Sequence, residues 1–145
     1  MKKVSFIPVI GVLLMLFSCN GSGRMSDMPK FDKKECHYEK GFQDYADFCK
    51  YFYNEDSVKQ FETHDKFSKV SGSDIPQIQA YFEDFKERIQ DTEYYEKFDF
   101  DCLSQVKIDD CFYIYTKEGY EKFGYYDVYY VDMSKCMLYF IHSNT

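Results

Sequence analysis

The stretch YYDVYYV at residues 125–131, followed by DMSK at 132–135 and CMLYFIH at 136–142, decides the fold. Its two long segments are rich in β-branched and aromatic residues, which favour strands. The four residues between these segments suit a tight antiparallel connection. The sequence therefore predicts a β-hairpin near the C-terminus.

Both faces of this hairpin are apolar. Side chains alternate between the two faces of a strand, so one face carries Tyr129, Val131, Leu138 and Phe140, and the other carries Val128, Tyr130, Tyr139 and Ile141. We expect one face to pack on helices. The second face needs another cover, which could be the tether that precedes the domain, a partner, or only tyrosine rings that lie partly in water.

Two aromatic-rich segments upstream of the hairpin, residues 98–103 and 111–116, are further strand candidates. If residues 105–108 form a turn, a symmetric hairpin places Cys102 directly opposite Cys111. The same register aligns aromatic residues at the neighbouring positions of the two strands. A disulfide between Cys102 and Cys111 is therefore predicted.

The cysteines leave alternatives open. Five of them follow Cys19, namely Cys36, Cys49, Cys102, Cys111 and Cys136, so at least one stays free or pairs between chains. Cys36 and Cys49 are thirteen residues apart and could also form a disulfide. A third alternative is that all five are small, buried hydrophobic side chains.

Upstream of residue 91, apolar residues follow helical spacing. Between residues 41 and 53 they recur at intervals of three and four, which predicts a first helix. A second, short helix is expected from Ser57, because residues 57–60 match a capping box, with Val58 and Phe61 on the buried side.

A third helix has the clearest signals. Asp74 supplies an N-cap and Pro76 an early proline. An apolar stripe follows, formed by Ile75, Ile78, Phe82, Phe85 and Ile89 with Tyr81 beside it. We therefore predict an α+β fold, in which two or three N-terminal helices pack on a C-terminal antiparallel sheet of three to four strands. A chain of 145 residues supports one small domain, which we place at residues 41–145.

The first residues carry an export signal. Lys2 and Lys3 form a short basic start, and residues 4–17 are mostly apolar. This run is too short to span a bilayer as an ordinary helix, but it has the length of a signal-peptide core. It ends directly before a polar segment that is rich in glycine and serine.

The end of this run predicts lipidation, and the alternative is an ordinary secretory signal with an incidental cysteine. Leu16, Ser18 and Cys19 resemble the lipobox of bacterial lipoproteins, although Phe17 is bulkier than the usual occupant of its position. The resemblance implies that residues 1–18 are removed and that Cys19 becomes an acylated N-terminus carrying diacylglycerol, with palmitate-type chains. Residues 19–40 then form the lipidated N-terminus and tether, which places the domain on the outer side of a membrane in the cell envelope.

The chain is acidic, with a formal net charge of −7. A charge of this sign repels phosphate backbones, so nucleic acid is not an expected partner. It also disfavours adsorption to anionic lipid. The expected contact with a membrane is therefore the lipid anchor.

A second resemblance covers about half the chain. The motifs DIP at residues 74–76, YF at 81–82, YTKEG at 115–119 and YFIHSN at 139–144 carry it. With these motifs, residues 74–144 resemble a small domain that recurs in envelope and secreted proteins of low-GC Gram-positive bacteria. The resemblance implies a shared fold and an exported setting, and no activity.

Metal, cofactor and catalytic motifs are not predicted. Cys36 and His37 are adjacent rather than at ligand spacing such as Cys-x-x-Cys, and the sequence holds no phosphate loop or Gly-x-Ser-x-Gly motif. No spacing favours a pairing of Cys49 or Cys111 with His142.

The acidic pairs also have simpler interpretations. Asp99 and Asp101 alternate on one face of an expected strand, and Asp109-Asp110 suit a turn. No catalytic residue is assigned.

The tyrosines are the best lead to a function. Tyrosine adds area and a hydroxyl group to recognition surfaces, and the candidates for a binding face are Tyr113, Tyr115, Tyr129, Tyr130 and Tyr139. The alternative is that these rings form the core of a domain without tryptophan. We expect an anchored module that binds a protein, peptide or glycan; the alternatives are an acidic inhibitor or immunity-type protein that captures a basic toxin, and a small envelope hydrolase.

Overall fold

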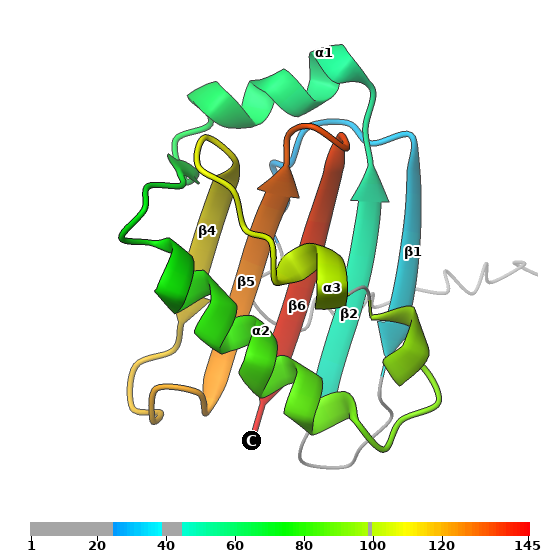
Figure 1. The fold of residues 1–145 in the computed structure, drawn as a ribbon, viewed down its shortest axis with the longest axis vertical. Helices are drawn as coiled ribbons and strands as arrows, with labels where there is room; N and C mark the ends of the chain where they lie inside the picture. Colours follow the sequence, from blue (N-terminus) through cyan, green and yellow to red (C-terminus); the bar gives the residue numbers. More distant parts are fainter. Residues whose placement is uncertain (1–24, 39–44, 99) are drawn as a thin grey trace, which may run out of the picture.

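The computed structural model describes residues 25–38, 45–98 and 100–145. Its main element is an antiparallel sheet of six strands in the order β1-β2-β6-β5-β4-β3 (Figure 1). The strands are β1 (Lys33–Tyr38), β2 (Tyr45–Phe52), β3 (Ser68–Lys69), β4 (Cys111–Thr116), β5 (Tyr125–Asp132) and β6 (Met137–Asn144). The helical segments are α1 (Glu55–Val58), η1 (Lys59–Thr63), α2 (Ile75–Ile89), η2 (Tyr95–Lys97) and α3 (Phe100–Leu103).

The predicted fold class is wrong, because the N-terminal half supplies strands as well as helices. Residues 45–52 form β2 between β1 and β6, where a helix is expected. Both faces of β2 are covered, so Ala46, Asp47, Phe48 and Cys49 are buried in succession. A continuous buried run does not distinguish a strand from a helix by its periodicity.

The segment at residues 98–103 also differs from its prediction. Its C-terminal part is the short helix α3, and β3 takes the place beside β4 that a strand at 98–103 would fill. Cys111 lies opposite Val131 in β5 and Lys69 in β3, and its thiol is free. The predicted Cys102–Cys111 disulfide is therefore wrong.

The alternative pairing of Cys36 with Cys49 is confirmed. The two residues are directly opposite each other in β1 and β2, with their Cα atoms 4.1 Å apart, and they form a disulfide. A link that closes a loop of this length stabilises the fold by about 2–3 kcal/mol. The disulfide fastens the edge strand β1 to the rest of the sheet.

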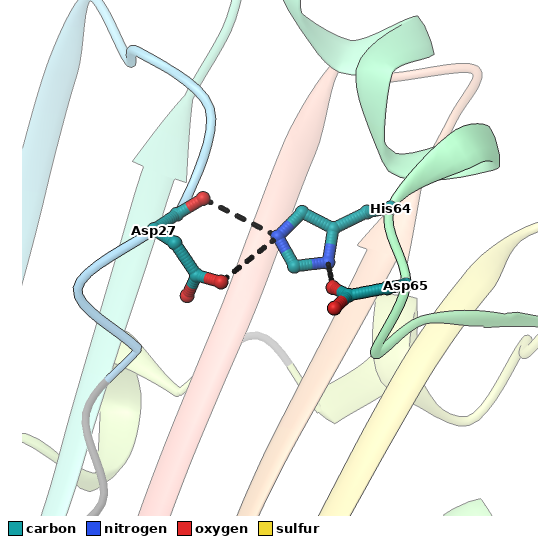
Figure 2. Close-up of side chains that lie close together, drawn as sticks. All are labelled: Asp27, His64 and Asp65. Atoms are coloured by element: carbon teal, nitrogen blue, oxygen red, sulfur yellow. Dashed lines mark hydrogen bonds and ion pairs between the residues drawn. The ribbon is translucent and has the colours of Figure 1, made fainter.

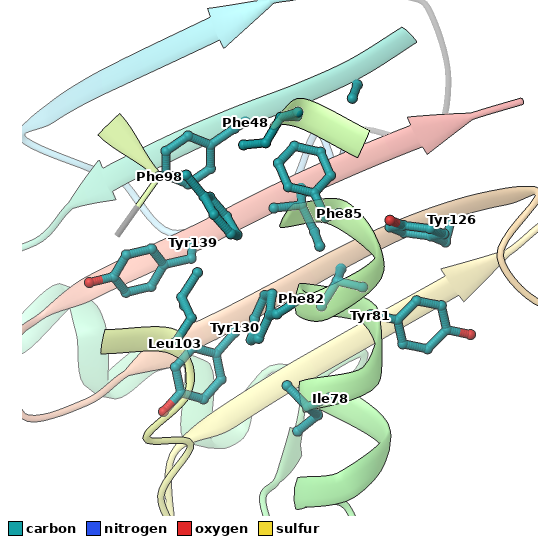
Figure 3. Packing of buried hydrophobic residues seen from close by; sticks show 14 of the residues in the cluster. Phe48, Ile78, Tyr81, Phe82, Phe85, Phe98, Leu103, Tyr126, Tyr130 and Tyr139 are labelled. Carbon is teal, nitrogen blue, oxygen red and sulfur yellow. The ribbon is translucent and has the colours of Figure 1, made fainter. Parts of the chain in front are cut away.

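The predictions for α2 and for the C-terminal hairpin are confirmed. The helix spans Ile75–Ile89, and its stripe of Ile78, Phe82, Phe85 and Ile89 is fully buried. Figure 3 shows Ile78, Phe82 and Phe85 of this stripe packed on sheet residues that include Phe48, Tyr126, Tyr130 and Tyr139. We call this side of the sheet the helix face.

The opposite side of the sheet is covered by the chain itself. Its core contains Cys49, Tyr51, Tyr129, Val131, Leu138 and Phe140. Part of the cover is α1 and η1, where the predicted burial of Val58 and Phe61 is confirmed, although Asn54 rather than Ser57 caps α1. The rest is the segment at residues 25–31, which we call the strap.

The strap lies within the residues expected to form a tether. Met25 is buried, and its backbone N–H donates a hydrogen bond of 3.1 Å to the Tyr129 hydroxyl. Phe31 packs edge-on against Tyr51, with ring centroids 5.0 Å apart. The tether differs from its prediction from Met25 onward, because a few apolar side chains without strong periodicity are enough to hold an irregular segment on a sheet. We call this side of the sheet the strap face.

Candidate functional site

The tyrosines expected to form one binding face do not share a face. Tyr130 and Tyr139 belong to the core of the helix face, and Tyr129 to the core of the strap face, each with about 1% of its surface exposed. Tyr113 is half-buried, and Tyr115 is exposed at 38%. Most of these rings are core because a domain without tryptophan fills both faces of its sheet with tyrosine and phenylalanine.

A groove lies instead at the edge of the helix face, between β1 and the segment that contains η2 and α3. It has a volume of about 870 Å³ and is lined by Glu35, Cys36, His37, Lys50, Lys86, Tyr95, Glu96, Lys97, Phe98, Phe100 and Asp101. In Figure 1 the helical layer crosses the sheet from β4 to β2, and β1 lies at its margin. We call this feature the β1–η2 groove.

The strand register explains which side chains enter the groove. Glu35 and His37 pair with Lys50 and Phe48 of β2, and Phe48 is in the core of the helix face. Residues directly opposite each other in an antiparallel pair point to the same face. Glu35 and His37 therefore point to the helix face at the place where the helical layer ends.

His37 is held between two aromatic rings. Its imidazole stacks on Tyr94 with centroids 5.8 Å apart and on Phe48 with centroids 6.1 Å apart. The Tyr94 hydroxyl donates a hydrogen bond of 2.7 Å to the carbonyl oxygen of Ala46, which fixes the segment before η2 on β2. His37 is thus a half-buried ring in a position set by its neighbours.

The charges around His37 favour its neutral form. Burial lowers the pKa of His37, and the ammonium groups of Lys97 and Lys50 lower it further, while Glu35 opposes them. The imidazole is therefore neutral at neutral pH.

The groove does not present a catalytic arrangement. Cys36 is oxidised in the disulfide, and the Glu35 carboxylate accepts a hydrogen bond of 2.7 Å from Lys33 Nζ. Among the described lining residues, no thiol or hydroxyl lies beside an oriented base, which nucleophilic catalysis needs.

The cysteines considered with His142 are not brought to it. Cys49 is in the disulfide, and Cys111 lies opposite Val131, four residues along β5 from the position opposite His142. Burial raises the pKa of the Cys111 thiol to about 11, which disfavours the thiolate form at neutral pH.

His142 has a different partner, which the sequence analysis missed. Its Nδ1 lies 2.5 Å from Asp127 Oδ1 across β5 and β6, and both residues are almost fully buried. Among the described residues, His142 Nε2 and Asp127 Oδ2 have no hydrogen-bond partner. The strand alternation alone could have placed Asp127 and His142 on one face, but their register depends on the exact turn.

The other acidic candidates lie apart. Asp99 lies outside the described residues, and Asp101 is exposed at the margin of the groove. Asp109 is in the expected turn with a φ of 71°, and the buried Asp110 accepts hydrogen bonds from the Tyr130 hydroxyl and the Met133 backbone N–H. Burial raises the pKa of Asp110, against the effect of these bonds. These carboxyl groups do not flank a common cleft.

A cluster of Asp27, His64 and Asp65 joins the strap to the end of η1 (Figure 2). His64 Nε2 lies 3.8 Å from Asp27 Oδ2, and His64 Nδ1 lies 3.3 Å from Asp65 Oδ1. The two carboxylates thus face opposite nitrogens of one ring, and Lys66 Nζ, 3.4 Å from Asp27 Oδ1, already neutralises one of them. A single metal ion binds one nitrogen of a histidine, so we interpret the cluster as a clamp that holds the strap.

The N-terminal signals fall on residues that the structure does not describe. Cys19 lies outside the described residues, and its lipidation stays a prediction. In the part of the chain that is described, no helix has the length and apolar character needed to cross a bilayer. Comparisons with family models, with curated proteins and with solved structures returned no match to this chain.

Proposed function

We propose that this protein is a lipoprotein of the cell envelope, anchored through Cys19, which binds a small ligand or an extended polymer segment in the β1–η2 groove. The observation that carries the proposal is the groove itself. It is built from β1, β2, α2 and the η2–α3 segment, and it combines aromatic walls with charged side chains at about 870 Å³. Ligand sites are usually concave, and this one is lined by more charged than aromatic side chains.

The disulfide supports the exported setting. Structural disulfides form and persist outside the cytosol, where thiols are not kept reduced. Cys36 and Cys49 are bonded in the middle of two paired strands, so the link is part of the fold. This agrees with the basic start, short apolar run and cysteine of residues 1–19.

The groove replaces the aromatic face as the proposed binding surface. Tyr129, Tyr130 and Tyr139 are core residues with about 1% of their surface exposed, so they do not form an accessible binding surface.

The binding proposal is tested by filling the groove. Glu35 and Lys34 are exposed neighbours on β1; Glu35 lines the groove, and Lys34, which pairs with Tyr51, points to the strap face. In a Cys19→Ser background, where the anchor does not hold the protein, we expect Glu35→Trp to abolish retention of the protein by purified envelope fractions, and Lys34→Trp to leave it unchanged. Retention of both variants at the wild-type level would overturn the proposal.

The anchor is tested separately. Cys19→Ser should remove the acyl mass and release the protein from the membrane fraction, because the predicted acyl chains are its expected attachment. An unchanged mass and unchanged fractionation would show that the anchor is elsewhere.

A further inference from the structure

We propose that the β1–η2 groove binds a neutral oligosaccharide, with one sugar ring stacked on Tyr95 and with sugar hydroxyl groups hydrogen-bonded to the charged side chains of the lining. The inference rests on the proposed function, because it names the class of ligand in the same groove. Its evidence is a lining in which positive and negative groups lie side by side, next to a half-buried aromatic ring.

The charges of the groove are balanced and interleaved. Three lysines and three carboxylate side chains line it, namely Lys50, Lys86, Lys97, Glu35, Glu96 and Asp101. Glu35 is directly opposite Lys50 in the β1–β2 pair. Glu96 precedes Lys97 in η2, and both are exposed, so salt screens the two charges alike. An anionic or a cationic ligand would therefore meet repulsive groups as well as attractive ones.

Sugar hydroxyl groups suit this mixed lining. A hydroxyl group both donates and accepts hydrogen bonds, whereas an ammonium group only donates and a carboxylate only accepts. The neutral imidazole of His37 adds one donor and one acceptor, in a position fixed by Tyr94 and Phe48. A ligand with many hydroxyl groups can pair with all of these groups and brings no charge of its own.

Tyr95 provides the stacking surface. It is half-buried at the start of η2, where it packs against the core of the helix face. Within the described part of the chain, its ring has no aromatic partner and its hydroxyl makes no hydrogen bond. The other rings of this segment are engaged, because Phe98 is buried and Phe100 has the Lys86 ammonium 3.7 Å from its centroid. The C–H bonds of a sugar ring can pack on the electron-rich face of Tyr95.

A peptide fits the groove less well. Peptides commonly bind by adding a strand to a sheet edge, or as a helix whose apolar face lies in an apolar groove. The backbone groups at the edge of β1 lie in the plane of the sheet, whereas the groove is on the helix face, where β1 presents side chains. Its lining is charged rather than apolar. Peptide binding is therefore the competing outcome of the test.

The test uses the absence of tryptophan from the chain. Tyr95→Trp keeps a ring that can stack and introduces a single fluorophore at the groove. The full-length variant, in a detergent without a sugar headgroup, is titrated with chitotetraose, cellotetraose, maltotetraose and mannotetraose, and in separate arms with blocked tetraalanine and with inorganic phosphate. We expect a saturable fluorescence change with at least one of the four sugars and none in the other arms. The affinity for the sugar should be insensitive to sodium chloride, because neither partner contributes a net charge to the contact.

Matched variants locate the stacking contact. Saturation-transfer NMR measures sugar binding to the wild type and to variants without a fluorophore. Tyr95→Phe should bind like the wild type, and Tyr95→Ala should bind about two- to twelvefold more weakly, which is the range for one aromatic contact. Tyr120→Ala removes an exposed tyrosine beside a separate cavity, and it should have no effect.

Three outcomes would overturn the inference: no saturable binding of any of the four sugars, sugar binding that Tyr95→Ala leaves unchanged, or saturable binding of tetraalanine in place of the sugars. If the sugars fail while Glu35→Trp still abolishes retention of the Cys19→Ser protein by envelope fractions, groove binding stands and only the oligosaccharide is wrong. If Glu35→Trp retains full binding, the proposed function itself fails.

Discussion

The two apolar faces of the sheet are shielded from water by different kinds of cover. The hairpin of β5 and β6 is apolar on both sides, so each side needs a cover. The helix face is covered by α2, a regular helix with a buried stripe, whereas the strap face is covered by short helical turns and the irregular strap. A regular helix that covers a sheet can be predicted from its sequence periodicity, whereas an irregular segment that covers a sheet has no such pattern.

The largest expected effect tests whether the two covers are packed equally well. Phe82 on the helix face and Phe61 on the strap face are both fully buried. Phe82→Ala should cost about 4 kcal/mol, and Phe61→Ala about 3 kcal/mol, because η1 is short and can move into the cavity. Urea denaturation of both variants checks this, and an equal or larger cost at Phe61 would mean that the strap face is as rigid as the helix face.

The second test concerns the buried polar pair on the strap face. Asp127→Leu leaves the His142 imidazole without its hydrogen bond and should cost about 3 kcal/mol. Asp127→Leu combined with His142→Phe removes both polar groups and should be more stable than the single variant. A double-mutant cycle measured by urea denaturation gives the coupling, and additive losses would show that the pair is not coupled.

The third test removes the disulfide at the margin of both faces. The double variant Cys36→Ser and Cys49→Ser should lose about 2–3 kcal/mol and should expose the amides of β1 to hydrogen exchange. The same loss should follow when wild type is reduced with dithiothreitol. Cys136→Ser, at a free and half-buried cysteine, is the control and should change stability by less than about 1 kcal/mol.

The smallest expected effect is a difference in how the stability of the fold depends on the ionisation of Asp132 and of Asp110, two carboxyl groups at the turn end of the hairpin. Burial by itself raises the pKa of Asp132, but hydrogen bonds from Ser134 Oγ and the Lys135 N–H and the charge of Lys107 outweigh it, so the pKa lies below its ordinary value of 3.8. The ionised form therefore stabilises the fold above that value, and this stability is lost as the pH falls below it.

Asp110 has the opposite sign, because its pKa is raised in the fold. Its protonation favours the folded state as the pH falls, so removal of the Asp110 charge should stabilise the fold most at neutral pH.

The measurement for Asp132 is urea denaturation of Asp132→Asn at neutral pH and at about pH 3. The loss of stability caused by this substitution should be smaller in acid. A loss that is the same at both pH values would show that the Asp132 charge has no part in stability.

The sequence predicts the elements with local signals. Pro76 and the apolar stripe predict α2, and the aromatic alternation on either side of residues 132–135 predicts the hairpin. β2 is not predicted as a strand, because it is buried on both faces and because its pairing with β6 joins residues about 90 positions apart. The choice of Cys36–Cys49 over Cys102–Cys111 depends on those same strand assignments.

The candidate site could not be predicted from the sequence. Its residues come from four separate segments, and each of them is an ordinary lysine, glutamate or aromatic residue in its own context. Only the edge position of β1 and the limited width of the helical layer bring them together. His37 was visible in the sequence, but nothing near it indicated the rings of Tyr94 and Phe48.

The strap also sets the distance between the domain and the bilayer. Met25 is fixed to Tyr129 on the strap face, and only six residue steps separate it from Cys19. A fully extended segment of that length spans about 22 Å, which is less than the diameter of a small domain, about 30 Å. An acylated Cys19 would therefore orient the molecule, with the strap face toward the lipid and the mouth of the groove on the side open to arriving molecules.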